Sequence, residues 1–440
     1  MLVNAHKLKF IVLTILGIGI MNVAQAQSWS LEQCLDSAMV HNKKLQISTN
    51  EISRFNEKEK EVKSNLLPKI TANGDYKYFF DLPTQLMPQS VFGGPEGVYK
   101  EAQFGVPHNI NANLQLSMPL YSPELYGGIK TVKIASEVAV IQKEKTAEQI
   151  YFDISNLYYN AQIINSQLDF IEGNLTNSKQ LLENVNLLHN QLLLTQADVD
   201  KVALQVQQLE TMKLSAQSKN DQVINGLKLQ MGVSLTNDFS INAEIKQGTS
   251  IAYATKPSLD FRLAETKNGL LNAELSTLKN SRYLPTIALY GSYGTVGYGY
   301  DGEPKTFLDF YPTTFGGLKI SIPIFNGNTT NKKISQKRLE IQNIELQKGL
   351  INDQYTVQIQ NAKLQMNAAQ QTITSSELQI NLAQSVYDQV LLQNKEGLAS
   401  LTEVLLADNA IRSAQQQYLS SLIDYLKAEL ELKKYTGNLK

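Results

Sequence analysis

The chain has 440 residues but only one cysteine, one tryptophan and four histidines, and these scarcities exclude several kinds of site. The lone cysteine, Cys34, has no partner for an internal disulfide or a thiolate metal site. His41, His108 and His189 stand far apart, without the short spacing of metal-ligating pairs. Neither a Gly-x-Ser-x-Gly nucleophile elbow nor a phosphate-binding P-loop occurs. We therefore expect no enzyme activity, no metal and no cofactor.

Long apolar runs are also scarce, and the clearest one stands at the start of the chain. Lys7 and Lys9 precede an apolar run at residues 10–20, and an Ala-Gln-Ala sequence follows at residues 24–26. This is the plan of a secretory signal, which we assign to residues 1–26. The run of about 11 residues is shorter than the roughly 20 that a membrane-spanning helix needs, and no later run approaches that length.

Neither sign of charge dominates the rest of the chain. Without the two lysines of the signal, it carries 38 basic and 41 acidic side chains, a formal charge of −3. This balance predicts no nucleic-acid binding. The 12 prolines are concentrated in a few places, between long tracts rich in Gln, Asn, Leu and Ser. Such a distribution is typical of long helices with few interruptions.

The chain does contain an internal repeat. Residues 395–404 resemble residues 190–199, and their last members, Val404 and Val199, are 205 positions apart. Other landmarks, among them a Leu-Pro pair in each half, keep the same order, which indicates a duplication. We expect a first repeat at 27–232, a linker at 233–255 and a second repeat at 256–440.

Each repeat has the pattern of one helix, two strands and two long helices. Ser30 and Gln33 form a capping-box pattern, and the helix that they open should end at about Leu67, before Pro68. Alternating apolar residues predict barrel strands at about 70–80, 110–120, 286–300 and 314–324. The side chains that we expect to face lipid are Ile110, Leu114, Leu116, Leu318, Ile320 and Ile322.

The helices after the strands are unusually long. Ser122 and Pro123 begin one that continues to about residue 165, and a second should extend from there to Gly232. Its apolar heptad seam consists of Leu181, Val185, Leu188, Leu192, Val199, Val202, Val206 and Leu209. Helices of about 45 to 60 residues extend roughly 65 to 90 Å, which no single compact domain needs.

Four strands cannot close a barrel, because the smallest known barrels have eight. Two chains would supply eight strands and little lumen, whereas three would supply twelve and leave room for a passage. Polar residues between the apolar ones, Asn111, Asn113, Gln115 and Ser117, suit a water-filled interior. Aromatic residues of the strands are either a girdle at the membrane interface or ordinary strand formers: Tyr76, Tyr78, Phe79, Tyr290, Tyr293, Tyr298 and Tyr300.

Together with the strands and long helices, several short motifs resemble those of the TolC family of outer-membrane efflux proteins, over essentially the whole mature chain. The most specific similarity is residues 397–400, Gly-Leu-Ala-Ser, with residues 404–407, Val-Leu-Leu-Ala. Further matches are the start at residues 30–35 with Asn42, and Tyr418-Leu419, residues 424–426 and residues 435–437. The first repeat departs from the family pattern, since Leu192 stands where the family usually has glycine.

The resemblance implies a mainly α fold with a small β part. It implies a homotrimer in the outer membrane, whose shared 12-stranded β-barrel is continuous with a periplasmic α-helical barrel. It further implies a passive exit duct, embedded in outer-membrane lipid, that docks with a periplasmic adaptor (membrane fusion protein) and an inner-membrane transporter. Tripartite efflux and type I secretion use the same duct, and the sequence does not separate drug, metal, peptide and protein substrates.

Two sets of residues are candidates for roles in such a duct. The paired long helices should turn near residues 165–171 and 370–376, so we expect adaptor-docking tips at Asn165, Gln167, Leu168, Asp169, Gln371, Thr372 and Ile373. Residues 354–376 contain a single charged side chain, Lys363, which favours an amide-lined periplasmic constriction. The first repeat leaves a carboxylate ring open as the alternative. The constriction candidates are Asn361, Gln365, Asp153 and Asn160.

Two other classes of protein compete with a channel. A periplasmic or surface coiled-coil scaffold without channel activity would explain the helices, but not alternating strands at matching places in both halves. A secreted hydrolase would need a catalytic constellation, which the sequence lacks. The glycine- and proline-rich segment 81–108 is either a surface loop over the pore mouth or a tolerated insertion.

Overall fold

A computed structural model describes residues 28–245, 253–303 and 305–439. The expected signal and part of the expected linker, residues 246–252, lie outside the described residues. The chain divides into two compact units. Unit 1 takes Met1–Thr49, Gln142–Phe261 and Ile351–Lys440, and unit 2 takes Asn50–Ile141 and Arg262–Leu350. Each unit therefore contains segments of both sequence repeats.

Unit 1 is built mainly from two helical hairpins, of which the first helix in each begins in unit 2. The first joins α4 (Pro123–Asn190) to α5 (Gln196–Met231), and the second joins α7 (Thr329–Lys395) to α8 (Leu401–Tyr435). The helix α2 (Leu31–His41) packs with α5, and the short strands β1 (Ser28–Trp29) and β6 (Ser240–Ile241) pair in parallel. The helix α6 (Leu259–Tyr283) begins in this unit.

The hairpin turns lie at residues 191–195 and 396–400, so our prediction of turns near 165–171 and 370–376 is wrong. Those stretches lie inside α4 and α7, because they contain no proline or glycine and their apolar side chains pack in the core. Both hairpins instead turn at a residue with positive φ, Leu192 (64°) and Gly397 (74°). Capping boxes then start the second helices, at Thr195 with Asp198 and at Ser400 with Glu403.

The apolar seam is shared between helices rather than running along one. Leu181 and Val185 of α4 pack with Val199 and Val202 of α5, in a core that also includes Tyr387 of α7 and Val404 of α8. When the two helices of a hairpin bury residues at the same period, the heptad pattern continues across the turn, and here only the polar Thr195 interrupts it. This explains why the seam did not reveal the turn.

The expected helix from Ser30 to about Leu67 has a break. Ser30 and Gln33 form the capping box that opens α2, but Asn42 is extended and α3 (Lys43–Ser64) begins after it. The Asn42 Oδ1 atom accepts hydrogen bonds from the amides of Lys44 (2.8 Å) and Leu45 (3.3 Å), and its Nδ2 donates to the carbonyl of Gln230 (2.6 Å). Asn42 therefore ends one helix and caps the next.

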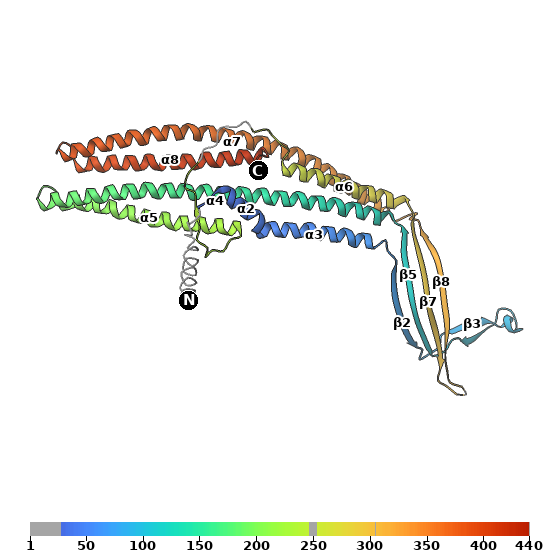
Figure 1. Cartoon of the computed structure of the whole chain (residues 1–440). Coiled ribbons are helices and arrows are strands. Elements are labelled where there is room, and N and C mark those ends of the chain that lie inside the picture. Colours follow the sequence, from blue (N-terminus) through green and yellow to red (C-terminus); the bar gives the residue numbers. More distant parts are fainter. Residues whose placement is uncertain (1–27, 246–252, 304, 440) are drawn as a thin grey trace, which may run out of the picture. The chain divides into compact units, whose positions relative to one another are not determined.

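Unit 2 contains a four-stranded antiparallel sheet in the order β2-β5-β7-β8 (Figure 1). Its strands are β2 (Lys69–Tyr78), β5 (His108–Tyr121), β7 (Thr286–Tyr300) and β8 (Phe307–Ser321). The last strand lies earlier than the expected 314–324, so Ile322 falls outside it. Segment 81–108 contains its own hairpin, with β3 (Thr84–Pro88), the 3-10 turn η1 (Gln89–Phe92) and β4 (Tyr99–Gln103).

In the described part of the chain, no helix is both long enough and apolar enough to cross a membrane.

Candidate functional site

The strand register gives the sheet one apolar and one polar face. Directly paired residues share a face, and the pairs Ile70–Leu116, Leu114–Tyr293 and Leu289–Leu318 define the apolar one. Five of the six expected lipid-facing side chains lie on it, at Ile110, Leu114, Leu116, Leu318 and Ile320. Leu318 and Ile320 are more than 60% exposed, so nothing in the chain itself covers this face at β8.

The other face carries amides and charges. Asn73 Nδ2 donates to Asn113 Oδ1 (3.2 Å), and Asn113 Nδ2 donates to Asn111 Oδ1 (3.0 Å), so a chain of amides crosses from β2 to β5. Register pairs place Lys77 and Asp309 on the same face. A face of this kind requires water.

The strand aromatics do not form the single girdle that we considered. Tyr76, Tyr78 and Tyr293 lie on the apolar face, whereas Tyr290 and Tyr298 pair with polar-face residues. Tyr300 shares their face, because it lies two residues beyond Tyr298 on the same strand. The sequence could not separate the two groups, because β7 has glycine at many positions and its apolar alternation is weak.

At the hairpin turns, leucines point into solvent. Leu192 is 90% exposed, Leu193 67% and Leu398 80%. In contrast, the expected tip residue Ile373 is 2% exposed and belongs to a core with Leu422, so its assignment to a docking tip is wrong. The other expected tip residues, Asn165, Gln167, Leu168, Asp169, Gln371 and Thr372, also lie within α4 and α7 rather than at a turn.

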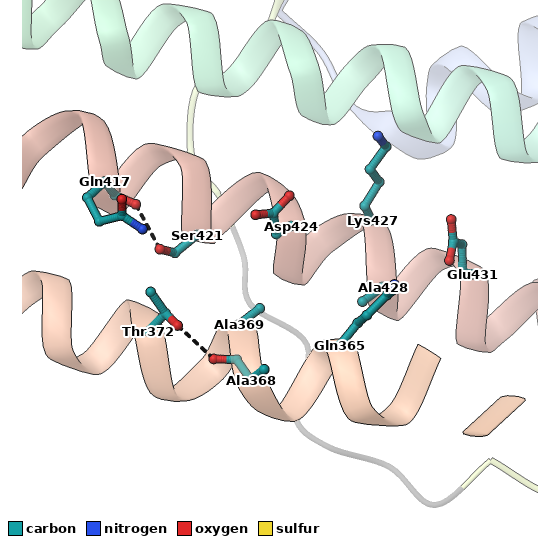
Figure 2. Close-up of a pocket in the computed structure, with 10 residues that line it drawn as sticks. All are labelled: Gln365, Ala368, Ala369, Thr372, Gln417, Ser421, Asp424, Lys427, Ala428 and Glu431. Atoms are coloured by element: carbon teal, nitrogen blue, oxygen red, sulfur yellow. Dashed lines mark hydrogen bonds between the residues drawn. The ribbon is translucent and has the colours of Figure 1, made fainter. Parts of the chain in front are cut away.

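The constriction candidates occupy two helices. Asn361 and Gln365 are exposed on α7, one helical turn apart, and Gln365 lines a groove of about 550 Å³ between α7 and α8 (Figure 2). The groove also contains Asp424 and Glu431 of α8. Sequence reasoning missed these carboxylates because it considered residues 354–376 without the antiparallel helix that packs beside them.

The first-repeat candidates make contacts within their own helix. The Asp153 carboxylate accepts a hydrogen bond from Gln149 Nε2 (2.7 Å), and Asn160 Nδ2 donates to the carbonyl of Asn156 (2.7 Å). Both residues are half-buried on α4. Each side chain therefore already makes a hydrogen bond within its own helix.

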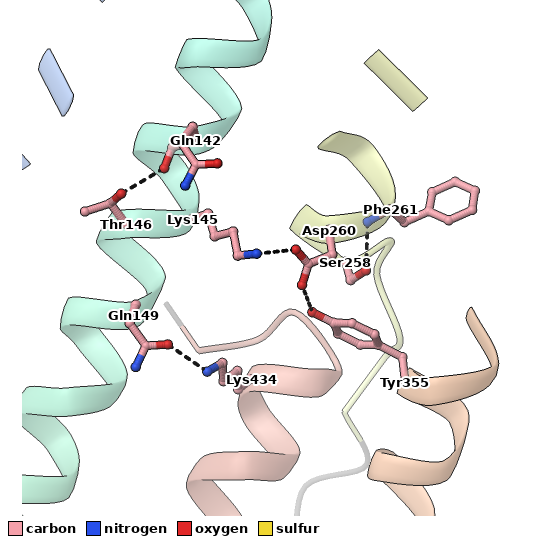
Figure 3. Close-up of polar contacts among 9 residues, drawn as sticks. All are labelled: Gln142, Lys145, Thr146, Gln149, Ser258, Asp260, Phe261, Tyr355 and Lys434. Atoms are coloured by element: carbon pink, nitrogen blue, oxygen red, sulfur yellow. Dashed lines mark hydrogen bonds and ion pairs between the residues drawn. The ribbon is translucent and has the colours of Figure 1, made fainter. Parts of the chain in front are cut away.

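An ion pair and a hydrogen bond to the same carboxylate connect three helices of unit 1 (Figure 3). Lys145 of α4 donates to Asp260 Oδ1 at the start of α6, and the Tyr355 hydroxyl of α7 donates to Asp260 Oδ2 (2.9 Å). Burial opposes ionisation of Asp260, but the bonds from Lys145 and Tyr355 hold its pKa below the ordinary value. Burial and then the Asp260 charge raise the pKa of Tyr355. The cluster is a structural tie, because each charged group has its partner.

A second buried polar contact joins the two hairpins. Asp408 of α8 is 4% exposed and accepts hydrogen bonds from Gln205 Nε2 of α5 (2.5 Å) and from Arg412 Nη2 (2.7 Å). Gln205 Nε2 also donates to Ser178 Oγ of α4 (3.2 Å). Burial raises the pKa of Asp408, although Arg412 and Gln205 oppose this shift.

Comparison with known proteins agrees with this architecture. Residues 272–438 match a family described as "Outer membrane efflux protein". The chain is 21% identical to the outer membrane protein TolC of Salmonella enteritidis over 94% of this chain and 83% of that protein. It is 21% identical to the solvent efflux pump outer membrane protein SrpC of Pseudomonas putida, over 93% and 85%.

A solved structure shares the fold. The outer membrane protein VceC of Vibrio cholerae superposes with a TM-score of 0.71 at 14% identity, over 92% of this chain and 96% of that one. The fold with long helical hairpins and a small sheet is therefore shared with this outer membrane protein. The second half of the chain thus matches the outer membrane efflux protein family, and nearly the whole chain is similar to TolC in sequence and to VceC in fold.

Proposed function

We propose that the chain is the subunit of an outer-membrane exit duct, which passively conducts substrates out of the cell from an inner-membrane transporter and a periplasmic adaptor. The observation that carries this proposal is the sheet, which has one apolar face, one polar face and open edges at β2 and β8. Open edges cannot stay unpaired in lipid, because the bilayer offers backbone groups no hydrogen bonds.

The same edges support a homotrimer. The β8 strand runs antiparallel to β7 and β2 antiparallel to β5, so β8 of one copy is antiparallel to β2 of the next when the sheets join. Three copies give twelve strands, with the apolar faces toward outer-membrane lipid and the amide-bearing faces toward a lumen. The helical hairpins then extend the duct into the periplasm.

We assign adaptor docking to the turns at residues 191–195 and 396–400. Exposed Leu193 and Leu398 occupy matching places, 205 residues apart, at the ends of the two hairpins. Cysteines at these two positions should crosslink to a periplasmic adaptor. Crosslinks that appear only with cysteines on α3, near the strands, would reverse the proposed orientation.

The constriction remains a choice between two linings. Asn361 and Gln365 support a gate lined by amides. The alternative is a gate lined by carboxylates, which Asp153 and the groove residues Asp424 and Glu431 would supply. An amide gate conducts nearly independently of pH between about 4 and 7, where carboxylates titrate. Strong block by micromolar trivalent cations, relieved by acid, would assign the gate to carboxylates.

Channel activity itself is tested with purified protein in planar bilayers. We expect the current to increase in steps of equal size as single channels insert into the bilayer. The absence of any current from folded, trimeric protein would overturn the duct and favour a coiled-coil scaffold.

A further inference from the structure

Six aromatic side chains lie on the polar face of β7 and β8. The register pairs Tyr300 directly with Phe307, and it pairs Tyr298 with Asp309 and Tyr290 with Gly317. Because alternate residues of a strand share a face, Tyr311 and Phe315 lie on this face as well. We call Tyr290, Tyr298, Tyr300, Phe307, Tyr311 and Phe315 the aromatic ladder.

The rings of the ladder associate in pairs across the two strands. The ring centroids of Tyr290 and Phe315 are 6.3 Å apart, those of Tyr298 and Tyr311 6.0 Å, and those of Tyr300 and Phe307 6.4 Å. These separations fall in the range of favourable aromatic contacts. Tyr290 also lies across Gly317, where an added Cβ would meet its hydroxyl at 3.0 Å. Two of the pairs lie together near the turn between β7 and β8, and the Tyr290–Phe315 pair lies closer to the other end of the strands.

The ladder rings remain open to solvent despite these contacts. Tyr311 and Phe315 are each 53% exposed and Tyr290 is 43% exposed. Exposed apolar rings gathered on one surface form a patch of the kind that marks ligand-binding sites.

The neighbours show which side of the membrane barrel this face would take. Tyr298 is paired with Asn109, and Asn109 is paired with Lys77, so the ladder shares its face with a charged side chain. Asp309 lies beside Tyr298 on the same face. Placing charged and amide side chains in lipid costs free energy. The polar face should therefore line the lumen, and the apolar face should contact the lipid.

The polar face thus has two halves of different chemistry. The β2 and β5 half offers amides and charges, including Asn73, Asn111 and Asn113, whereas the β7 and β8 half offers ring faces and edges. We propose that the aromatic ladder is a binding path for planar aromatic solutes, cationic or neutral, as they pass along the lumen. This inference rests on the proposed duct function and specifies the class of substrate that it favours.

The physical reason is stacking. Planar aromatic solutes gain contact energy on tyrosine and phenylalanine rings, and cationic ones gain an additional cation–π attraction. Each contact is weak enough to be released, and the pairs offer a solute successive binding places at two levels along β7. Polar groups of the solute can hydrogen-bond to the amide half in the same cross-section.

The test uses the trimer in planar bilayers, with ethidium as a planar aromatic cation and tetrabutylammonium as an aliphatic one. Ethidium should interrupt the current of the wild type for longer than tetrabutylammonium does. The double variant Y298L/Y311L keeps apolar side chains but removes one ring pair, and it should shorten the ethidium dwell time by about three- to tenfold. The dwell time of tetrabutylammonium should stay the same.

The matched control is Y293L, because Tyr293 lies on β7 but on the apolar face, where it is 69% exposed. It should leave the ethidium dwell time unchanged. An equal dwell time in the wild type and the double variant, or an equal loss in Y293L, overturns the ladder while leaving the channel in place. Absence of current in the wild type overturns the duct itself. F315L replaces the double variant if that protein fails to insert.

Discussion

The two helical hairpins have the same plan, and two of the matched positions at which they differ are informative. The first hairpin turns through Leu192 and the second through Gly397, 205 residues later, although both backbones are left-handed there. Asp408 of the second hairpin is buried, whereas its counterpart in the first is Ala203. The two hairpins therefore share turn geometry and capping boxes but differ in their side chains, and the Gln205 amide of the first donates a hydrogen bond to the Asp408 carboxylate of the second.

The largest effect should come from breaking this complementarity. D408A removes the carboxylate that accepts from both Gln205 and Arg412, so the buried Gln205 keeps only its bond to Ser178 and the partly buried Arg412 loses its ion pair. Loss of one member of a buried pair typically costs about 3 kcal/mol or more. The thermal midpoint of the purified protein should fall clearly, whereas D408N, which keeps an acceptor oxygen, should fall less. Equal midpoints for D408A and the wild type would show that the contact is incidental.

The same residue predicts a dependence on pH. Burial raises the folded-state pKa of Asp408 above its ordinary value. Its contribution to stability is therefore fully present below the ordinary pKa and is lost as the pH rises through the folded pKa. The stability of the wild type relative to D408N should decrease as the pH rises from about 4 to 7. A difference that is constant over this range would contradict the assigned shift.

Exchanging the turn residues should change the stability of the turns by a smaller amount, with opposite signs in the two hairpins. A left-handed backbone costs a residue with a Cβ roughly 1–2 kcal/mol, which glycine avoids. L192G should therefore stabilise the first turn by about 1 kcal/mol, and G397L should destabilise the second by about the same amount. Amide hydrogen exchange at residues 191–195 and 396–400 measures both. Changes of the same sign in the two turns would mean that the turns do not share a geometry.

The smallest effect should come from the capping residues. T195A and S400A each remove a hydroxyl that accepts from the third amide of the following helix, a loss of about 1 kcal/mol. The two variants should increase exchange to similar extents in the first turns of α5 and α8. A large effect from only one would show that the capping boxes are not equivalent.

Much of the architecture could be predicted from the sequence, because it depends on local signals. The Ser30 capping box and the alternation of residues 110–120 have a direct chemical cause and appear in the structure. The hairpin turns were misplaced by about 25 residues. A heptad seam interrupted only at Thr195 hid the first turn, and the second was placed by the repeat offset, although the capping patterns at Thr195 and Ser400 could have located both.

The side-chain neighbourhoods could not be predicted, because they depend on which segments the fold brings together. Asp424 and Glu431 reach the groove at Gln365 only because α8 packs antiparallel beside α7. In the same way, Tyr290 and Tyr298 are assigned to the polar face only by strand register, because the glycines of β7 blur its alternation.

The most direct test of the shared barrel is crosslinking between the two free edges of the sheet, in a C34S background. The variant N73C on β2 is combined in turn with D309C, Y311C, T313C or F315C on β8, all on the polar face. In a closed trimer each β2 edge meets the β8 edge of the next subunit, three times around the ring. Oxidation of one of these cysteine pairs should therefore give covalent dimers and trimers and nothing larger. A ladder of products beyond the trimer, or no intermolecular product from any combination, would contradict a twelve-stranded barrel.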